Sequence, residues 1–203
     1  MPGAGVLPVA LHKGKLYFLL GKENPMEDTA KGFSDFGGGI DRGESVFSSA
    51  LREASEELSG FLGPPSQILS HIEKHGGFYK IEVPHIHDPS KVGYSLHIIH
   101  IDYDPMLPFY YNNNHHFLWK RMNKRLLNAS KLFEKIEIKW ICEDNLKRHM
   151  PDYRSFFKNT MTHIWRELPK IKAFIRKCAK KCKTTKNRNP IKKYNRTIRG
   201  GQR

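Results

Sequence analysis

Residues 38–58 read GGIDRGESVFSSALREASEEL, and this stretch decides the fold of the chain. On a helix, Glu53, Glu56 and Glu57 lie at i, i+3 and i+4, which brings their carboxylates to one face. Apolar residues recur three or four positions apart on another face and predict an amphipathic helix over 45–58: Phe47, Ala50, Leu51, Ala54 and Leu58. The packing that buries the apolar stripe therefore directs the acidic side chains to a common site.

Three carboxylates on one helix face require a positive partner. At an effective dielectric near 20, two like charges about 4 Å apart repel by roughly 4 kcal/mol. A hard divalent cation such as Mg²⁺ or Mn²⁺ offsets this repulsion because it prefers oxygen ligands, and it can neutralise a diphosphate and activate water. An isolated acidic segment would be read as a solvated helix face. The preceding glycines, Glu44 and Arg52 favour the metal site, since Gly38 lets the backbone approach closely and Arg52 can hold a glutamate.

Residues 38–60 resemble the Nudix box. That motif reads Gly, five residues, Glu, seven residues, Arg-Glu, an apolar residue, any residue, Glu-Glu, any residue, Gly and an apolar residue. Ser59 stands where the family has Gly, Gly60 stands where it has an apolar residue, and Phe36 replaces the proline of many members. The glycine, the acids and the arginine of the motif match at Gly38, Glu44, Arg52, Glu53, Glu56 and Glu57.

The resemblance implies an α/β/α sandwich with a mixed β-sheet over residues 1 to about 170. It also implies a metal site made by Glu53, Glu56, Glu57 and the backbone of Gly38. Catalytic roles fall to Glu57, Glu56, Arg52 and Glu44. Many Nudix-like enzymes use a further acid near a late strand that ends in an aromatic residue. Glu134 and Glu137, ahead of Trp140, are the candidates, and the alternative for each is an exposed charge at a strand edge.

Helices and strands alternate along the rest of the chain, which predicts an α/β layered fold. A hairpin is expected at Val6–Leu11 and Leu16–Leu20. Residues 104–131 are expected to form a long loop with a short helix at 117–127, and a second long helix is expected from 152 to about 177. Further strands are predicted at 33–36, 67–72, 78–83, 94–103 and 136–142.

Positive charge is concentrated at the C-terminal end. Residues 170–203 contain 14 Lys/Arg and no Asp/Glu, whereas the other 169 residues are nearly neutral. We therefore predict a hydrolase domain at 1–175 and a basic, disordered tail at 176–203 that contacts a polyanion such as RNA. A solvated segment or a targeting signal is the alternative. The candidate RNA contacts are Lys177, Lys180, Lys181, Lys183, Lys186, Arg188, Lys192, Lys193, Arg196 and Arg199.

Other features carry weaker signals. The sparse, odd set of three cysteines suits a reducing compartment, and no apolar run reaches the length of a membrane span. We therefore expect an intracellular, cytoplasmic location, without secretion. The His85, His87 and Asp88 pattern lacks further metal ligands and is interpreted as an ordinary loop. The aromatic residues at 109–111 and 78–79 could stack on a nucleobase or pack as a lid.

These observations predict a metal-dependent pyrophosphohydrolase that acts on a nucleoside-diphosphate type of phosphoanhydride. The basic extension is similar in layout to the mRNA-decapping Nudix enzymes of eukaryotes and large DNA viruses, so the 5′ cap of mRNA is the preferred substrate. Free nucleotides, dinucleoside polyphosphates and diphosphoinositol phosphates are alternatives. An inactive Nudix-fold module that binds RNA or another ligand is the rival class, and the intact set of glutamates argues against it.

Overall fold

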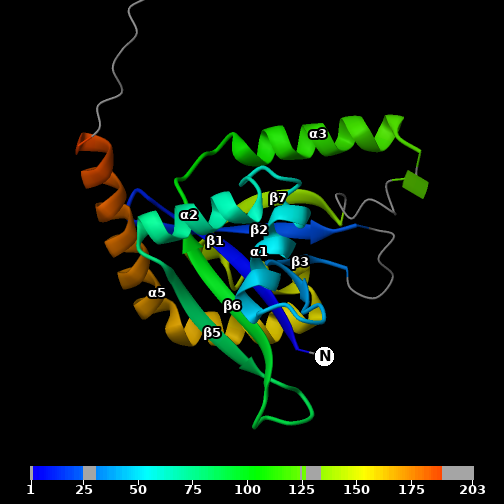
Figure 1. The fold of residues 1–203 in the computed structure, drawn as a ribbon, viewed down its shortest axis with the longest axis horizontal. Helices are drawn as coiled ribbons and strands as arrows, with labels where there is room; N and C mark the ends of the chain where they lie inside the picture. The colour runs from blue at the N-terminus through cyan, green and yellow to red at the C-terminus, as the bar shows by residue number, and fades with distance from the viewer. Residues whose placement is uncertain (1, 25–30, 124, 127–133, 189–203) are drawn as a thin grey trace, which may run out of the picture.

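The computed structural model describes residues 2–24, 31–123, 125–126 and 134–188, the last six by their backbone alone. One sheet of seven strands lies between helices (Figure 1). The strands are β1 (Gly3–His12), β2 (Lys15–Glu23), β3 (Phe33–Ser34), β4 (Phe36–Gly39), β5 (Phe78–Pro84), β6 (Val92–His100) and β7 (Lys135–Cys142). The helices are α1 (Val46–Glu57), α2 (Pro65–His75), α3 (Leu107–Arg121) and α5 (Ser155–Arg188), with short 3₁₀ turns at Glu143–Asn145 and Met150–Asp152.

The sheet is mixed. Strand β1 pairs in parallel with β6, and all other pairings are antiparallel. The first half of β1 pairs with β4 and its second half with β2, so the glycine strand β4 lies beside the start of β1. Strand β7 pairs with β2 in antiparallel fashion. The β1–β2 turn places Lys13 (φ 48°) and Gly14 (φ 79°) in the left-handed region, as a two-residue hairpin requires.

Each face of the sheet has its own hydrophobic core. The α1 face buries Ala4, Val6 and Phe36 against Ala50, Ala54 and Leu58. The opposite face buries Leu7, Val9 and Phe18 against the α5 residues Phe157, Ile164 and Ile171. Figure 1 shows α1 and α2 on one side of the sheet and α5 on the other. The predicted α/β/α sandwich with a mixed sheet is confirmed.

The strand predicted at 67–72 is wrong, because this segment lies in helix α2. Ile68 and Ile72 are its buried residues, one helical turn apart, so the apolar pattern fits a helix as well as a strand. Pro65 occupies the first helical turn, where a missing N–H costs nothing. Gly76 ends the helix with φ 109°. The residues on both sides of the segment, Pro65 and Gly76, are typical of the start and the end of a helix.

Helix α3 is longer than expected and begins ten residues earlier, at Leu107 instead of 117. Its inward face is formed by Tyr111 and His115, which are buried one turn apart. An aromatic phenol and an imidazole give no aliphatic stripe, so the periodicity was not visible in the sequence. Strand β6 also ends earlier than expected, at His100.

Helix α5 continues to Arg188, well past the boundary predicted at residue 175. Cys178 and Cys182 are buried in this part of the helix, and the Cys182 sulfur lies 3.7 Å from Nδ1 of His100. The expectation of disorder is therefore wrong for residues 176–188, and residues 189–203 lie outside the described part of the chain. None of the described helices is both long and apolar enough to cross a membrane.

Candidate active site

Helix α1 is fixed at its start and along its inner face. The Ser45 hydroxyl accepts a hydrogen bond of 3.1 Å from the N–H of Ser48, which caps the first turn. Ala50, Ala54 and Leu58 are fully buried, and the two small alanines let the helix approach the sheet closely. The stripe predicted from the sequence is thus the packing face, and the acidic side chains project toward β4 and β7.

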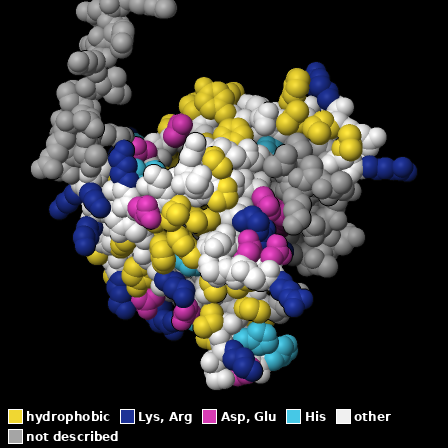
Figure 2. Space-filling view, viewed as in Figure 1, with side chains coloured by type: hydrophobic (Ala, Val, Ile, Leu, Met, Phe, Trp, Pro, Cys, Tyr) yellow, Lys and Arg dark blue, Asp and Glu magenta, His cyan; other side chains and the backbone are white. Residues whose placement is uncertain are grey.

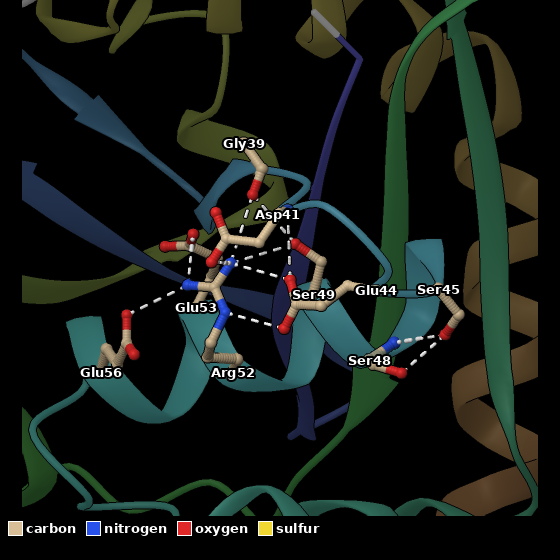
Figure 3. Close-up of polar contacts among 9 residues, drawn as sticks. All are labelled: Gly39, Asp41, Glu44, Ser45, Ser48, Ser49, Arg52, Glu53 and Glu56. Atoms are coloured by element: carbon tan, nitrogen blue, oxygen red, sulfur yellow. Dashed lines mark hydrogen bonds and ion pairs between the residues drawn. The ribbon is translucent and has the colours of Figure 1, made fainter.

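Arg52 connects the carboxylates of the loop and of the helix (Figure 3). Its Nε and Nη2 donate to the two oxygens of Glu44 at 2.9 and 3.1 Å, which forms a bidentate pair. Its Nη1 donates to Glu53 at 2.8 Å and to Glu56 at 3.2 Å. The hydrogen bonds from Arg52 lower the pKa of Glu44. Arg52 therefore orients three acids at once.

Three carboxylates converge beside the glycine strand. Oxygen atoms of Glu53, Glu57 and Glu134 lie within 4.8 Å of one another. The N–H of Gly37 donates to Oε2 of Glu57 at 2.8 Å. A Cβ at Gly38 would lie 2.7 Å from the Glu53 carboxyl carbon, so only glycine allows this approach. Burial raises the pKa of Glu57 well above its ordinary value, and a bound cation would favour its ionised form. This donor set fits a hard divalent cation.

Glu56 and Glu137 lie outside this group. Glu56 faces Arg52 with 30% of its side chain exposed, and its role as a metal ligand stays a prediction. Of the two candidate late acids, the structure brings Glu134 to the cluster. Glu137 is on the partly exposed side of β7, 3.7 Å from the amine of Lys22.

Lys135 is a functional residue that sequence reasoning missed. Its side chain is fully buried, and Nζ lies 3.1 Å from Oε1 of Glu57 and 3.1 Å from the Ser34 hydroxyl. It also forms an ion pair with Glu23, which Arg154 contacts at 2.5 Å. Burial alone would lower the pKa of Lys135, but the attraction of Glu57 and Glu23 raises it above its ordinary value. Lys135 is thus an internal cation behind the metal-ligand candidates.

The backbone after helix α1 explains how the chain tolerates its departure from the Nudix motif at residues 59 and 60. Ser59 has φ 49° and Gly60 has φ 72°, so both adopt left-handed backbone. The position where the family has Gly therefore needs a positive φ, and a serine adopts it here. Its hydroxyl lies 3.1 Å from Nε2 of His115. Residues 38–60 thus form a glycine-rich strand end, a loop and a helix, with the turn at Ser59 and Gly60 closing the helix.

A cavity of about 710 Å³ lies on the α5 side of the glycine strand. Gly37, Gly38 and Gly39 form one of its walls, so only this strand separates it from Glu53 and Glu57. Its other walls include Tyr94, Phe156, Arg154, Asn159, His85 and His87. Thr160 and Arg154 are also among its lining residues, and the Thr160 hydroxyl and the Arg154 Nε are buried without a hydrogen-bond partner among the described residues.

The structure also shows where the other candidate histidines, cysteines, aromatic residues and lysines lie. His85 and His87 line the cavity, and the described residues contain no metal-binding group at that loop or at Cys178 and Cys182. Of the aromatic residues, Tyr111 is fully buried and Phe78 packs on Phe47 with ring centroids 4.6 Å apart. Phe109 and Tyr110 are exposed. Lys177, Lys180 and Lys181 lie on the exposed side of α5.

No family model and no curated protein matches this sequence. Solved structures are similar to it, among them the Nudix hydrolase RenU of M. smegmatis, with 16% identity over 86% of this chain and 88% of that chain and a TM-score of 0.45. Another is the NUDIX domain of Shewanella oneidensis NrtR complexed with ADP ribose, with 13% identity over 73% of this chain and 76% of that chain and a TM-score of 0.42. A third is a C. elegans Ap4A hydrolase, with 16% identity over 88% of this chain and 95% of that chain and a TM-score of 0.36.

The contacts of Arg52 predict that its replacement by lysine is not conservative. One ammonium group cannot reach Glu44, Glu53 and Glu56 together, whereas the planar guanidinium fork does. We expect Arg52→Lys to lower kcat by roughly ten-fold or more, since the candidate ligand Glu53 loses its fixed orientation. Steady-state kinetics with Mn²⁺ and a diphosphate substrate provide the measurement. A lysine variant with unchanged kcat would show that only the charge matters.

Proposed function

We propose that this chain is a Nudix hydrolase that cleaves a phosphoanhydride bond with the help of Mg²⁺ or Mn²⁺. The observation that carries the proposal is the convergence of Glu53, Glu57 and Glu134 beside Gly37 and Gly38. Two of these acids come from one helix and the third from the residue just before the distant strand β7, whereas a solvated helix face would bring together only residues of one helix. Glu57 is also almost completely buried, and its neighbour Lys135 is shared with Glu23, so a further cation would stabilise its charge.

Each residue of the cluster has a separate task in this proposal. The metal ion, when bound, neutralises the diphosphate and lowers the pKa of the attacking water. Glu53 and Glu57 hold the ion, and Arg52 and Gly37 keep their carboxylates in position. Glu134 is more exposed than Glu57 and accepts the proton of the water. Glu44 fixes Arg52 from the loop side, and Glu56 is a further ligand candidate.

The cavity next to the cluster is the proposed place for the organic part of the substrate. It contains two aromatic side chains, two histidines and Arg154, and no carboxylate among its lining residues. Such a lining suits a nucleoside with its phosphates better than a sugar alone. We propose the capped 5′ end of RNA as the substrate, because the basic C-terminal segment supplies cations for a longer polyanion.

A substrate panel tests this proposal. Capped RNA, cap dinucleotide, a dinucleoside polyphosphate, ADP-ribose and a diphosphoinositol phosphate are compared with Mn²⁺ as the cofactor. We expect fastest turnover of capped RNA, and a chain that ends at Arg188 should lose affinity for capped RNA while it hydrolyses cap dinucleotide normally. The shortened chain must keep α5 complete, because Cys178 and Cys182 are buried. Binding without turnover of any substrate would leave the inactive module as the better description.

The unpartnered hydroxyl of Thr160 gives a separate prediction. Valine has almost the same shape, so Thr160→Val removes a buried group that has no described hydrogen-bond partner. We expect unfolding by urea to show equal or greater stability, by up to about 1 kcal/mol. If the hydroxyl binds substrate, KM should rise several-fold while kcat changes little. A variant with unchanged KM would remove Thr160 from the substrate site.

A further inference from the structure

Helix α3 has one face fixed to the active site. The Tyr111 hydroxyl donates to the carbonyl oxygens of Glu57 (2.7 Å) and Lys135 (3.1 Å). The amide of Asn112 donates to and accepts from the backbone of Ile138 in β7, at 3.1 and 2.8 Å. His115 stacks on Tyr111 with ring centroids 3.9 Å apart. These contacts hold α3 directly over the end of α1 and the edge of β7.

The opposite face of α3 presents aromatic rings and cations to solvent. Phe109, Tyr110 and Phe117 are 55%, 56% and 53% exposed. At 100° per residue, the exposed positions fall within an arc of about 160°. Figure 2 shows hydrophobic side chains along the edge formed by α3, with Lys or Arg side chains at its end. The outer face of α3 consists of Phe109, Tyr110, Asn113, Asn114, His116, Phe117, Lys120 and Arg121.

The chemistry of this face suits single-stranded nucleic acid better than a protein. Residues 105–131 contain five Lys/Arg and no Asp/Glu. The Arg121 guanidinium lies 3.9 Å from the centre of the Phe117 ring, so a cation already stacks on one aromatic residue. Aromatic rings that stack on bases, together with cations that follow the backbone, are the means by which proteins bind single strands without sequence preference. A carboxylate, which would repel phosphate, is lacking on the described outer face.

We infer that the outer face of α3 binds the single-stranded RNA that follows the phosphoanhydride bond in the substrate. This inference rests on the proposed function for its link to catalysis. Tyr111, on the inner face of α3, donates to the backbone carbonyl of Glu57, so RNA bound on the outer face lies about one helix diameter, roughly 10 Å, from that end of α1, a distance that a few nucleotides span. Bases stack on Phe109, Tyr110 and Phe117, while Lys120 and Arg121 contact phosphates.

The test measures binding of an uncapped, fluorescein-labelled single-stranded RNA by anisotropy at several salt concentrations. Phe109→Leu/Phe117→Leu keeps apolar bulk but removes two rings, and we expect Kd to rise roughly ten-fold or more. The salt dependence should stay the same, because no charge is removed. Lys120→Gln/Arg121→Gln should instead reduce the salt slope, by about 0.7 for each phosphate that the protein no longer neutralises. Val92→Ala, an exposed apolar residue of β6, is the control and should leave Kd unchanged.

The outcomes separate the inference from its alternatives. Unchanged RNA affinity in Phe109→Leu/Phe117→Leu would overturn the inference. A wild-type dimer that dissociates in Phe117→Ala, seen by sedimentation, would overturn it in favour of a contact between two copies. Hydrolysis of cap dinucleotide by all variants should equal that of the wild type, since this substrate has no RNA to reach α3. If the wild type hydrolyses nothing, the proposed function fails, and the anisotropy data still report on the α3 face.

Discussion

Glu57→Gln is expected to lower kcat by about 100-fold or more and to leave the fold intact. The variant removes the most buried charge of the carboxylate cluster, which is needed to hold the metal ion. The amide oxygen can still accept from the N–H of Gly37, and Lys135 keeps its ion pair with Glu23. The measurements are Mn²⁺ binding by calorimetry and single-turnover kinetics. Wild-type Mn²⁺ affinity together with wild-type kcat would contradict the assignment.

A matched pair of acids, Glu134 directly before β7 and Glu137 within it, extends this experiment. Glu134→Gln should reduce kcat strongly, because Glu134 reaches the cluster. Glu137→Gln should change it little, because Glu137 is 38% exposed and lies near Lys22. The two residues are three positions apart, and the sequence indicated both equally as candidates for the further acid. Equal losses in both variants would show that the bound state rearranges the start of β7.

The part of the site that could be predicted is the part encoded locally. Helix α1 supplies Arg52, Glu53 and Glu57 from six consecutive residues, so helical geometry alone brings them together. Its apolar stripe is clear because every member packs on the sheet. By contrast, the choice between Glu134 and Glu137 depends on where β7 starts and on which of its sides faces α1. That information lies in the pairing of β7 with β2, over a hundred residues away in the chain.

The wrong predictions about secondary structure also arise where contacts between distant residues decide the structure. The segment 67–72 contains apolar residues whose spacing fits both a helix and a strand, and the contacts of α2 with α1 and α5 decide between them. Helix α3 buries a phenol and an imidazole, whose partners include the carbonyl oxygens of Glu57 and Lys135 and the Ser59 hydroxyl, all distant in the sequence. Local hydrophobicity cannot indicate such a face. In α5, the many Lys and Arg residues indicated a disordered tail, although Cys178 and Cys182 are buried there.

Lys135 is the strongest case of a residue defined by its distant partners. Glu23 comes from β2 and Glu57 from α1, and neither is near Lys135 in sequence. Without Lys135, two buried carboxylates would face each other, with Arg154 in contact with Glu23 alone. We therefore expect Lys135 to serve as a permanent counter-ion that keeps the site folded before a metal ion binds. Breaking a buried ion pair by removing one partner costs about 3–5 kcal/mol.

Lys135→Met should consequently lower Tm in EDTA by roughly 6–20 °C, given the usual relation between stability and Tm for a chain of this size. Methionine keeps the length of the side chain and removes its charge. Mn²⁺ should restore part of the loss, because the ion offsets the charge of Glu57, so the gain in Tm on adding Mn²⁺ should exceed that of the wild type. Lys22→Met, on the partly exposed side of β2, is the control and should shift Tm little.

A double variant separates charge from packing. Glu23→Gln/Lys135→Met removes both members of one buried pair, and we expect it to be more stable in EDTA than Lys135→Met alone, since fewer uncompensated carboxylates remain. If the loss in Lys135→Met came from packing around Gly21, where a Cβ would lie 2.9 Å from the Lys135 side chain, the second substitution would give no recovery. A Lys135→Met protein with wild-type Tm in EDTA would show that the cluster folds without its internal cation.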